Sequence, residues 1–239
     1  MSALLEARQL TGLDDSHLVA VAGNHRLLPQ VAAAFNALQA DAAEAGFDLA
    51  IASSFRSFER QLAIFNGKAT GTRPVHDDQG AQVDMTTLGA RARLRAILRF
   101  SALPGTSRHH WGTDLDVYDA AAVDPGYQVQ LSPLEVVAGG VFEPLHNWLD
   151  ERMARDESHG FFRPYAVDRG GVAPERWHLS FAPAANACAG QLDAGLLRAC
   201  WDASAEEVLL RDEIERDLEE ILARFVTVPA DWCPAPWRR

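Results

Sequence analysis

Histidine and aspartate side chains occur at a spacing suited to a metal ion in residues 107–116, which read SRHHWGTDLD. Zinc is typically held by three His, Asp or Glu side chains, with the fourth position open for water. A turn at Gly112 would let a histidine before it and Asp116, on the strand after it, bind the same ion. His109 and His110 are both candidates, and only one can bind because adjacent side chains point in different directions. Taken alone, this spacing is more typical of a surface loop and a strand-end cap.

A second candidate lies at a loop-to-strand junction, where Glu175 precedes His178 by three residues in the sequence PERWHLSF. A carboxylate so close to a metal-bound histidine can reach a water at the metal, as the general base of a hydrolase must. Alone, the pair is a weak signal, because Glu175 could instead pair with Arg176.

A third candidate is Arg56, which follows an apolar run in the sequence SSFRSFERQ. An arginine at a strand-to-helix turn can direct a fixed positive charge into a cleft, where it stabilises an oxyanion or binds a carboxylate. The alternative is a surface arginine that pairs with Glu59.

The residues around the first candidate alternate as in a β-strand over residues 112–119. Successive side chains of a strand point to opposite faces, so Leu115 and Val117 are expected to face the core. Asp114 and Asp116 then share the opposite face. The alternation predicts that this strand presents carboxylates on one side only.

Residues 177–183 form a second expected strand, with Trp177 and Leu179 on one face and His178 and Ser180 on the other. Helices mixed with such short strands indicate an α+β fold. We expect a small, mostly antiparallel sheet that carries the site, flanked by helices, in a single domain over residues 1–239.

Helices and loops are expected around these strands. Pro29 suits a first helical turn and Gly46 a C-terminal cap, and Ser57 can cap a short helix. The expected elements are a helix over 29–45, a strand over 47–54, a helix containing 59–65, a loop over 70–82 and a helix over 88–100.

The second half of the chain is expected to be mainly helical. Residues 133–155 predict a helix whose first half is weakened by Gly139, Gly140 and Pro144. Ser204 and Glu207 have the spacing of a capping box for a last helix, at about 204–226. Its apolar stripe predicts core packing and consists of Leu210, Ile214, Leu218, Ile221 and Phe225.

Composition excludes several classes of partner. Acidic residues outnumber basic ones 33 to 22 among the 239 residues, for a formal charge of -11. This balance argues against nucleic-acid binding, which needs a basic surface. No apolar run approaches the roughly 20 residues of a membrane span, and the first residues lack the pattern of a secretory signal. A cytoplasmic location is expected unless an export signal was removed. Cys188, Cys200 and Cys233 are expected to be reduced thiols, with a Cys188–Cys200 disulfide as the alternative.

Together the three segments resemble a known family. The patterns are S-x-H-x-x-G-x-x-x-D at Ser107, E-x-W-H at Glu175, and S-x-F-R-S at Ser53. They resemble the zinc-dependent D-alanyl-D-alanine carboxypeptidases of vancomycin-resistance type, which are grouped with D-Ala-D-Ala dipeptidases and some phage endolysins. The segment 159–165 is similar to that family's aromatic approach to its second motif. The resemblance covers residues 53–181.

The resemblance implies a role for each matching residue. It implies Zn²⁺ on His109, Asp116 and His178, with Glu175 as the general base. It also implies that Arg56 faces the substrate, that Ser107 helps to hold the substrate's terminal carboxylate, and that Gln61 lines the same site. Asp114 departs from the family, where a small residue is common. It is expected either to support a ligand histidine or to change which substrate fits.

The expected reaction is hydrolysis of an amide bond near the C-terminus of a D-amino-acid-containing peptide, such as a peptidoglycan stem peptide. A D-alanyl-D-alanine carboxypeptidase is the first expectation. A D,D-dipeptidase, an L,D-carboxypeptidase and an endolysin-type endopeptidase on the same site are the alternatives. A zinc-binding module without activity is a further alternative, although both Glu175 and Arg56 are present. The oligomeric state is left open.

Overall fold

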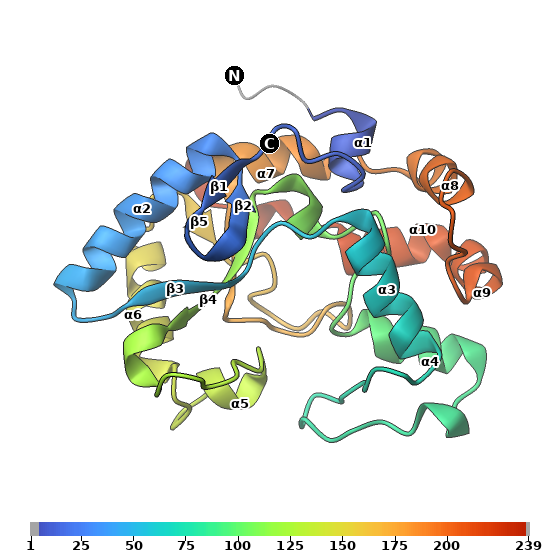
Figure 1. Cartoon of the computed structure of the whole chain (residues 1–239), viewed down its shortest axis with the longest axis horizontal. Helices are drawn as coiled ribbons and strands as arrows, with labels where there is room; N and C mark the ends of the chain where they lie inside the picture. Colours follow the sequence, from blue (N-terminus) through green and yellow to red (C-terminus); the bar gives the residue numbers. More distant parts are fainter. Residues whose placement is uncertain (1–4, 238–239) are drawn as a thin grey trace.

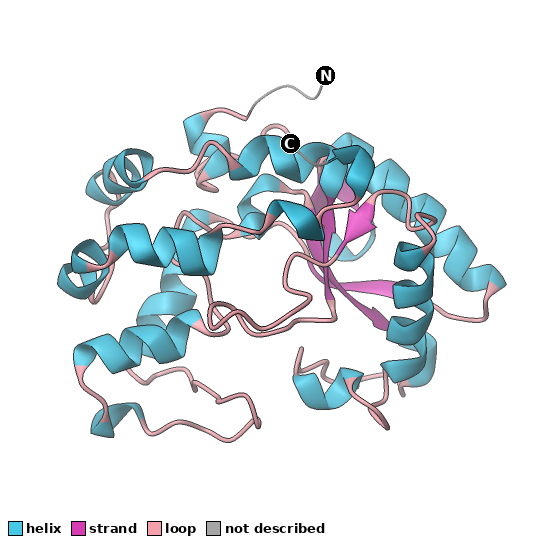
Figure 2. Cartoon of the chain, turned by 180° about the vertical axis from the view of Figure 1, so that it is seen from behind, coloured by secondary structure: helices cyan, strands magenta, loops and turns pink. Residues whose placement is uncertain are grey.

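The computed structural model of the chain describes residues 5–237, so the start of the N-terminal segment examined for a signal lies outside the described residues. Two small antiparallel sheets lie among the helices, which confirms the α+β class (Figures 1 and 2). The larger sheet has the strand order β3-β4-β6-β5, and β1 pairs with β2. The strands are β1 (Val19–Val21), β2 (His25–Leu27), β3 (Leu49–Ser53), β4 (Asp114–Asp119), β5 (Phe161–Phe162) and β6 (His178–Phe181).

The helices flank the larger sheet on both sides (Figure 1). None of those in residues 5–237 combines the length and apolar character that a membrane span requires. In the first half of the chain they are α1 (Ala7–Leu10), α2 (Pro29–Glu44), α3 (Phe58–Ala69) and α4 (Ala90–Leu98). In the second half they are α5 (Pro133–Val136), α6 (Glu143–Ala154), α7 (Ala182–Ala189), α8 (Ala194–Asp202), α9 (Arg211–Arg216) and α10 (Leu218–Ile221).

One face of the larger sheet is apolar. Leu115 and Val117 of β4 and Leu179 of β6 are 0–1% exposed and pack in one cluster with residues of α2 and α6. This is the core-facing set that the alternation predicts. Helices α2 and α6 therefore lie against the apolar face, and the opposite face is left to the polar side chains.

A second cluster joins α3 and α4 to the C-terminal helices. Phe58, Phe65 and Ile97 pack in it with the C-terminal stripe of Ile214 and Leu218. Core packing of that stripe is thus confirmed. The polar face of the sheet lies toward this second cluster, and the cavity described below opens there.

Two local features place the segments that carry the candidate residues. The Ser57 side chain accepts a hydrogen bond from Arg60 N and so caps α3, as predicted. Gly112 has φ of +69°, which favours glycine, and a Cβ there would collide with Leu18. The chain can therefore turn from the histidine pair into β4 within a close-packed corner.

The prediction for residues 133–155 is wrong as one continuous helix. The structure has a short α5, then a break, and α6 begins at Glu143. Gly139 has φ of +82°, and a Cβ on Gly140 would lie 2.6 Å from the Glu135 carbonyl. The two glycines allow the chain to reverse onto the end of α5, so the helix cannot continue through them.

The predicted capping box of the last helix is also wrong. Ser204 Oγ accepts from Glu206 N within a loop. The helix begins later, at Arg211, because Leu210 has φ of +59° and interrupts the helical path. Beyond it the segment is divided into α9, α10 and a π-helical turn over Leu222–Val226.

The helices and strands outside the predicted set are the β1–β2 hairpin, strand β5 and helices α1, α7 and α8. The expected strand over 177–183 is shorter, because α7 begins at Ala182 with Pro183 in its first turn. Cys188 and Cys200 are buried in different clusters and form no disulfide with each other.

Candidate active site

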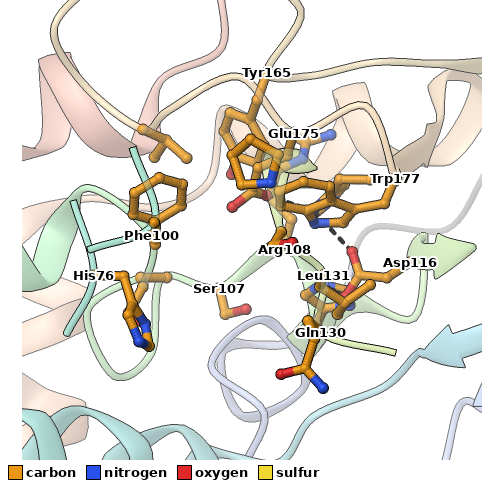
Figure 3. A pocket seen from close by; sticks show the side chains of 18 of the residues that line it. His76, Phe100, Ser107, Arg108, Asp116, Gln130, Leu131, Tyr165, Glu175 and Trp177 are labelled. Atoms are coloured by element: carbon orange, nitrogen blue, oxygen red, sulfur yellow. Dashed lines mark ion pairs between the residues drawn. The ribbon is translucent and has the colours of Figure 1, made fainter. Parts of the chain in front are cut away.

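A cavity of about 450 Å³ opens between the polar face of the sheet and the α3–α4 segment (Figure 3). Five of the predicted site residues line it: Arg56, Ser107, His109, Asp116 and His178. Glu175 lines it as well. The structure thus brings together six predicted residues from three distant segments. The other prominent lining residues are Lys68, His76, Asp77, Phe100, Ser101, Arg108, Gln130, Leu131, Leu134, Tyr165 and Trp177.

His109, Asp116 and His178 form a compact group whose ligand atoms all lie within 4.8 Å of one another. His109 Nε2 is 3.4 Å from Asp116 Oδ2, and His178 Nδ1 is 3.5 Å from Asp116 Oδ1. Two ligand atoms on one tetrahedral zinc ion, at bond lengths of about 2.1 Å, lie roughly 3.4 Å apart. The spacing therefore fits a single zinc ion.

One buried atom of this group lacks a hydrogen-bond partner. Within residues 5–237, Asp116 Oδ1, which lies 3.5 Å from His178 Nδ1, is buried and makes no hydrogen bond. Buried polar atoms are nearly always paired, so such an atom needs an explanation. Two nitrogen-bearing rings and a carboxylate are ligands that zinc accepts. The donor set and the unpaired Asp116 oxygen both fit a resident zinc ion.

Asp114 fixes the orientation of His178. Its Oδ1 lies 3.0 Å from His178 Nε2 and accepts from Arg108 Nε at 2.8 Å. Thr113 Oγ1 donates to the other carboxylate oxygen, and Arg108 also donates to Ser180 Oγ at 2.6 Å. Asp114 is fully buried. Of the two roles expected for Asp114, the geometry matches support of a ligand histidine.

His178 lies among three carboxylates. Its Nδ1 is 3.4 Å from Glu175 Oε2, and Asp114 and Asp116 lie on either side of the ring. Burial alone would lower the pKa of His178, but the bonds to Asp114 and Glu175 outweigh it and raise the pKa to about 9. The surrounding negative charge favours a cation, and a divalent metal ion at this point would balance it.

His110 makes different contacts from His109. Its Nδ1 lies 2.6 Å from the Arg56 carbonyl oxygen, and its Nε2 accepts from Gly105 N. Burial lowers the pKa of His110 to about 3, so the ring is neutral. Both ring nitrogens are thus used to hold the loop, and His109 is the member of the pair that faces Asp116.

Arg56 lines the cavity, and its backbone is joined to the histidine segment through Arg56 N and the His109 carbonyl oxygen. Its guanidinium donates to Gln61 Oε1 at 2.9 Å and to Ser53 Oγ at 3.4 Å. Burial lowers the pKa of Arg56, while Asp116 and Glu175 favour its charged form. The alternative, a surface arginine paired with Glu59, is not found within residues 5–237.

Gln61 differs from the expectation that it lines the site. It is fully buried, its Oε1 accepts from Arg56, and its Nε2 donates to the Ala102 carbonyl oxygen at 2.7 Å. Gln61 therefore lies behind Arg56 and holds the guanidinium in place. Ser107, by contrast, lines the cavity itself, next to the histidine segment.

Three further residues were missed by the sequence reasoning. Arg108 is 2% exposed, and nothing in the pattern indicates that it points inward to Asp114. Tyr165 packs edge-on against His178, with ring centroids 5.1 Å apart, and burial raises its pKa. Lys68 reaches the cavity from the end of α3. Tyr165 does fall in the aromatic segment 159–165 that the resemblance singled out.

Known proteins resemble this chain in sequence. A sequence model of the VanY family, described as D-alanyl-D-alanine carboxypeptidase, matches residues 24–184. An uncharacterized protein of Haemophilus influenzae is 48% identical over 103 residues, which are 41% of this chain and 70% of that protein. A second uncharacterized protein of that organism is 30% identical over 126 residues, which are 52% of this chain and 92% of that protein.

Solved structures share the fold. A zinc complex of a variant of the vancomycin-resistance D,D-pentapeptidase VanY from a VanB-type cassette is similar at a TM-score of 0.51 and 22% identity, over 76% of this chain and 84% of that one. VanYB in complex with D-alanine-D-alanine is similar at a TM-score of 0.50 and 21% identity, over 80% of this chain and 91% of that one. The sequence match covers all six cavity-lining candidates and more than half of the chain. The chain belongs to the VanY D-alanyl-D-alanine carboxypeptidase family.

Proposed function

We propose that this protein is a zinc-dependent carboxypeptidase that removes the C-terminal D-alanine from peptides of the peptidoglycan stem type. The observation that carries the proposal is the convergence of His109, Asp116 and His178 beside Glu175 in one cavity. Membership of the VanY family supports the substrate class. VanYB, which has a similar fold, was solved in complex with D-alanine-D-alanine.

A bound zinc ion would supply a Lewis acid for the scissile carbonyl and lower the pKa of a water molecule. Glu175 is placed to take a proton from the attacking water and to pass it to the leaving amine. Its Oε2 lies 3.4 Å from His178 Nδ1, which puts the base beside the ligand set. Its side chain is 12% exposed and so opens on the cavity.

Arg56 supplies fixed positive charge on the same cavity. Gln61 and Ser53 hold its guanidinium, so little reorganisation is needed when negative charge develops on the carbonyl oxygen. Ser107 lies on the same wall and can donate a hydrogen bond to the peptide. Together these residues bind, orient and polarise a peptide bond.

The decisive experiment compares stem peptides of different length. Zinc-loaded protein is incubated with tripeptide, tetrapeptide and pentapeptide stems, with free D-Ala-D-Ala and with a cross-linked stem dimer, and the released fragment is identified by mass spectrometry. The proposal expects a single D-alanine from the pentapeptide. Release of D-alanine from the tetrapeptide alone would instead assign an L,D-carboxypeptidase. Cleavage of free D-Ala-D-Ala alone would assign a D,D-dipeptidase, and cleavage of cross-bridges an endopeptidase. A metallated protein that cuts none of these would be a binding module.

A further inference from the structure

Lys68 is the only lysine in the sequence, and it lines the candidate active-site cavity. All other basic side chains of the chain are arginines. Lys68 lies near the end of α3, and its Nζ donates to Ser101 Oγ at 2.7 Å. An ammonium group carries three protons, so this bond occupies one of them. The remaining two can be donated to a ligand in the cavity.

The charge of Lys68 has no direct counterpart. Within residues 5–237, no carboxylate forms an ion pair with Lys68 or with Arg56, although acidic residues exceed basic ones in the chain. Both lie on the same cavity, where burial lowers the pKa of each and the Glu175 carboxylate opposes that shift without forming an ion pair with either. Two partly buried cations on one cavity are unfavourable unless anions lie near them, and the carboxylate that acts on both carries only the single charge of Glu175. The arrangement therefore favours an anionic ligand group.

The two sides of the cavity differ in character. Figure 3 shows His76 and Phe100 on one side and Asp116 and Trp177 on the other. Lys68 belongs to the first side, because its partner Ser101 follows Phe100 directly. Asp77, also on the cavity wall, accepts the N–H groups of Gln79 and Ala81 and so caps a turn. On the Trp177 side lies the apolar residue Leu131, which packs in one cluster with Trp177.

We propose that Lys68 binds the C-terminal carboxylate of the peptide substrate and so restricts the enzyme to cleavage at a free C-terminus. The inference rests on the proposed function and adds the residue that recognises the chain end. The terminal D-alanine then lies on the Lys68 side, and the rest of the peptide extends toward Leu131 and Trp177. This leaves Arg56 for the scissile carbonyl oxygen.

A kinetic test uses two substrates and two variants. The substrates are a pentapeptide stem with a free C-terminal carboxylate and the same peptide as its C-terminal carboxamide. Lys68→Met should lower kcat/KM for the free acid by about 10- to 100-fold, mainly through KM, because a charged hydrogen bond is lost. The wild type and Lys68→Met should cleave the carboxamide equally slowly. Arg60→Met, which removes one exposed charge from the same helix, should change the kcat/KM of neither substrate.

Equal losses on both substrates would overturn the inference, because Lys68 would then act through Glu175 or through the fold. An unchanged kcat/KM for the free acid would overturn it too. Lys68→Arg should retain part of the preference for the free acid, since it keeps the charge but not the ammonium geometry.

A binding test needs no turnover and leaves the Lys68 ammonium group unmodified. Labelling with ¹³C,¹⁵N-lysine gives the only lysine of the sequence its own side-chain signal, which the spectrum of Lys68→Arg identifies by its absence. In zinc-loaded Glu175→Ala protein, N-acetyl-D-Ala-D-Ala should shift this signal saturably, and its carboxamide should not. An unmoved signal would show that Lys68 does not bind the C-terminal carboxylate. A shifted signal, combined with a wild-type protein that hydrolyses no stem peptide, would support carboxylate binding by Lys68 and contradict the proposed reaction.

Discussion

His178 Nε2 lies 3.0 Å from Asp114 Oδ1, and this bond turns His178 Nδ1 toward Asp116 and Glu175. Asp114 is held in turn by Arg108 and Thr113. A carboxylate that accepts from one ring nitrogen fixes the tautomer, so the other nitrogen is free to bind a metal. The orientation of a proposed ligand is thus set by a fully buried ion pair behind it.

Asp114→Asn should therefore weaken zinc binding about 10- to 100-fold, the usual effect of removing such a supporting carboxylate. The variant should also lose stability, because Arg108 would keep a buried charge without its counterion. Competition with a chromogenic chelator measures the affinity. Asp119→Asn, on the same strand but remote from His178, is the matched control and should bind zinc normally. Equal zinc affinity in the two variants would show that Asp114 does not support the metal site.

The neighbouring histidines should behave differently. His109→Ala should abolish stoichiometric zinc, because His109 faces Asp116. His110→Ala should keep the metal and lose stability, since its ring nitrogens contact the Arg56 carbonyl and Gly105 N. Elemental analysis of protein purified without added metal, combined with thermal unfolding, separates the two effects. Loss of zinc in His110→Ala alone would reverse the assignment.

Arg56 should act on the chemical step. Arg56→Ala should lower kcat by about 10² to 10³, the usual effect of losing one donor to an oxyanion. Lysine should restore little, because it lacks the planar fork that contacts Gln61 and Ser53. Gln61→Leu should lower kcat more mildly by freeing the guanidinium. Steady-state release of D-alanine measures all three. A raised KM with unchanged kcat would assign Arg56 to substrate binding instead.

Acid should destabilise the protein partly through His146. This side chain is fully buried, and burial with the nearby Arg163 and Arg176 lowers its pKa from 6.5 to about 2. The unfolded chain takes up the proton near pH 6.5 but the folded chain does not, so stability falls as the pH drops below 6.5. The loss is about 1 kcal/mol for each pH unit.

His146→Leu tests this dependence. Urea unfolding at pH 7 and pH 5 should show a smaller fall in unfolding free energy for the variant than for the wild type. The metal site and the other histidines are common to both proteins, so their titration cancels in the comparison. Parallel losses in the two proteins would show that His146 does not contribute.

Local periodicity predicted the parts of the fold that depend on neighbouring residues. The alternation around Leu115 and Val117 placed Asp114 and Asp116 on one face, and Pro29 and Ser57 marked helix starts. These signals act within a few residues, where backbone geometry decides which way a side chain points. The metal-ligand set was implied by the family resemblance, since local periodicity does not distinguish His109 from His110.

Features that depend on distant contacts were not predictable in this way. The capping box at Ser204 is a local signal, but the chain makes a turn at Leu210 before the helix begins. Arg108 and Lys68 point inward to Ser180 and Ser101, which lie 72 and 33 residues away along the chain. Long basic side chains are usually exposed, so their inward placement has no sequence pattern of its own.

We propose that Glu175 activates water beside a zinc ion held by His109, Asp116 and His178. The most direct measurement is the rate of D-alanine release from a stem pentapeptide by wild-type and Glu175→Ala proteins of equal, measured zinc content. The account predicts that Glu175→Ala keeps its zinc and that its kcat falls about 10² to 10⁴, the usual contribution of a general base. Near-normal turnover by the fully metallated Glu175→Ala protein would contradict it.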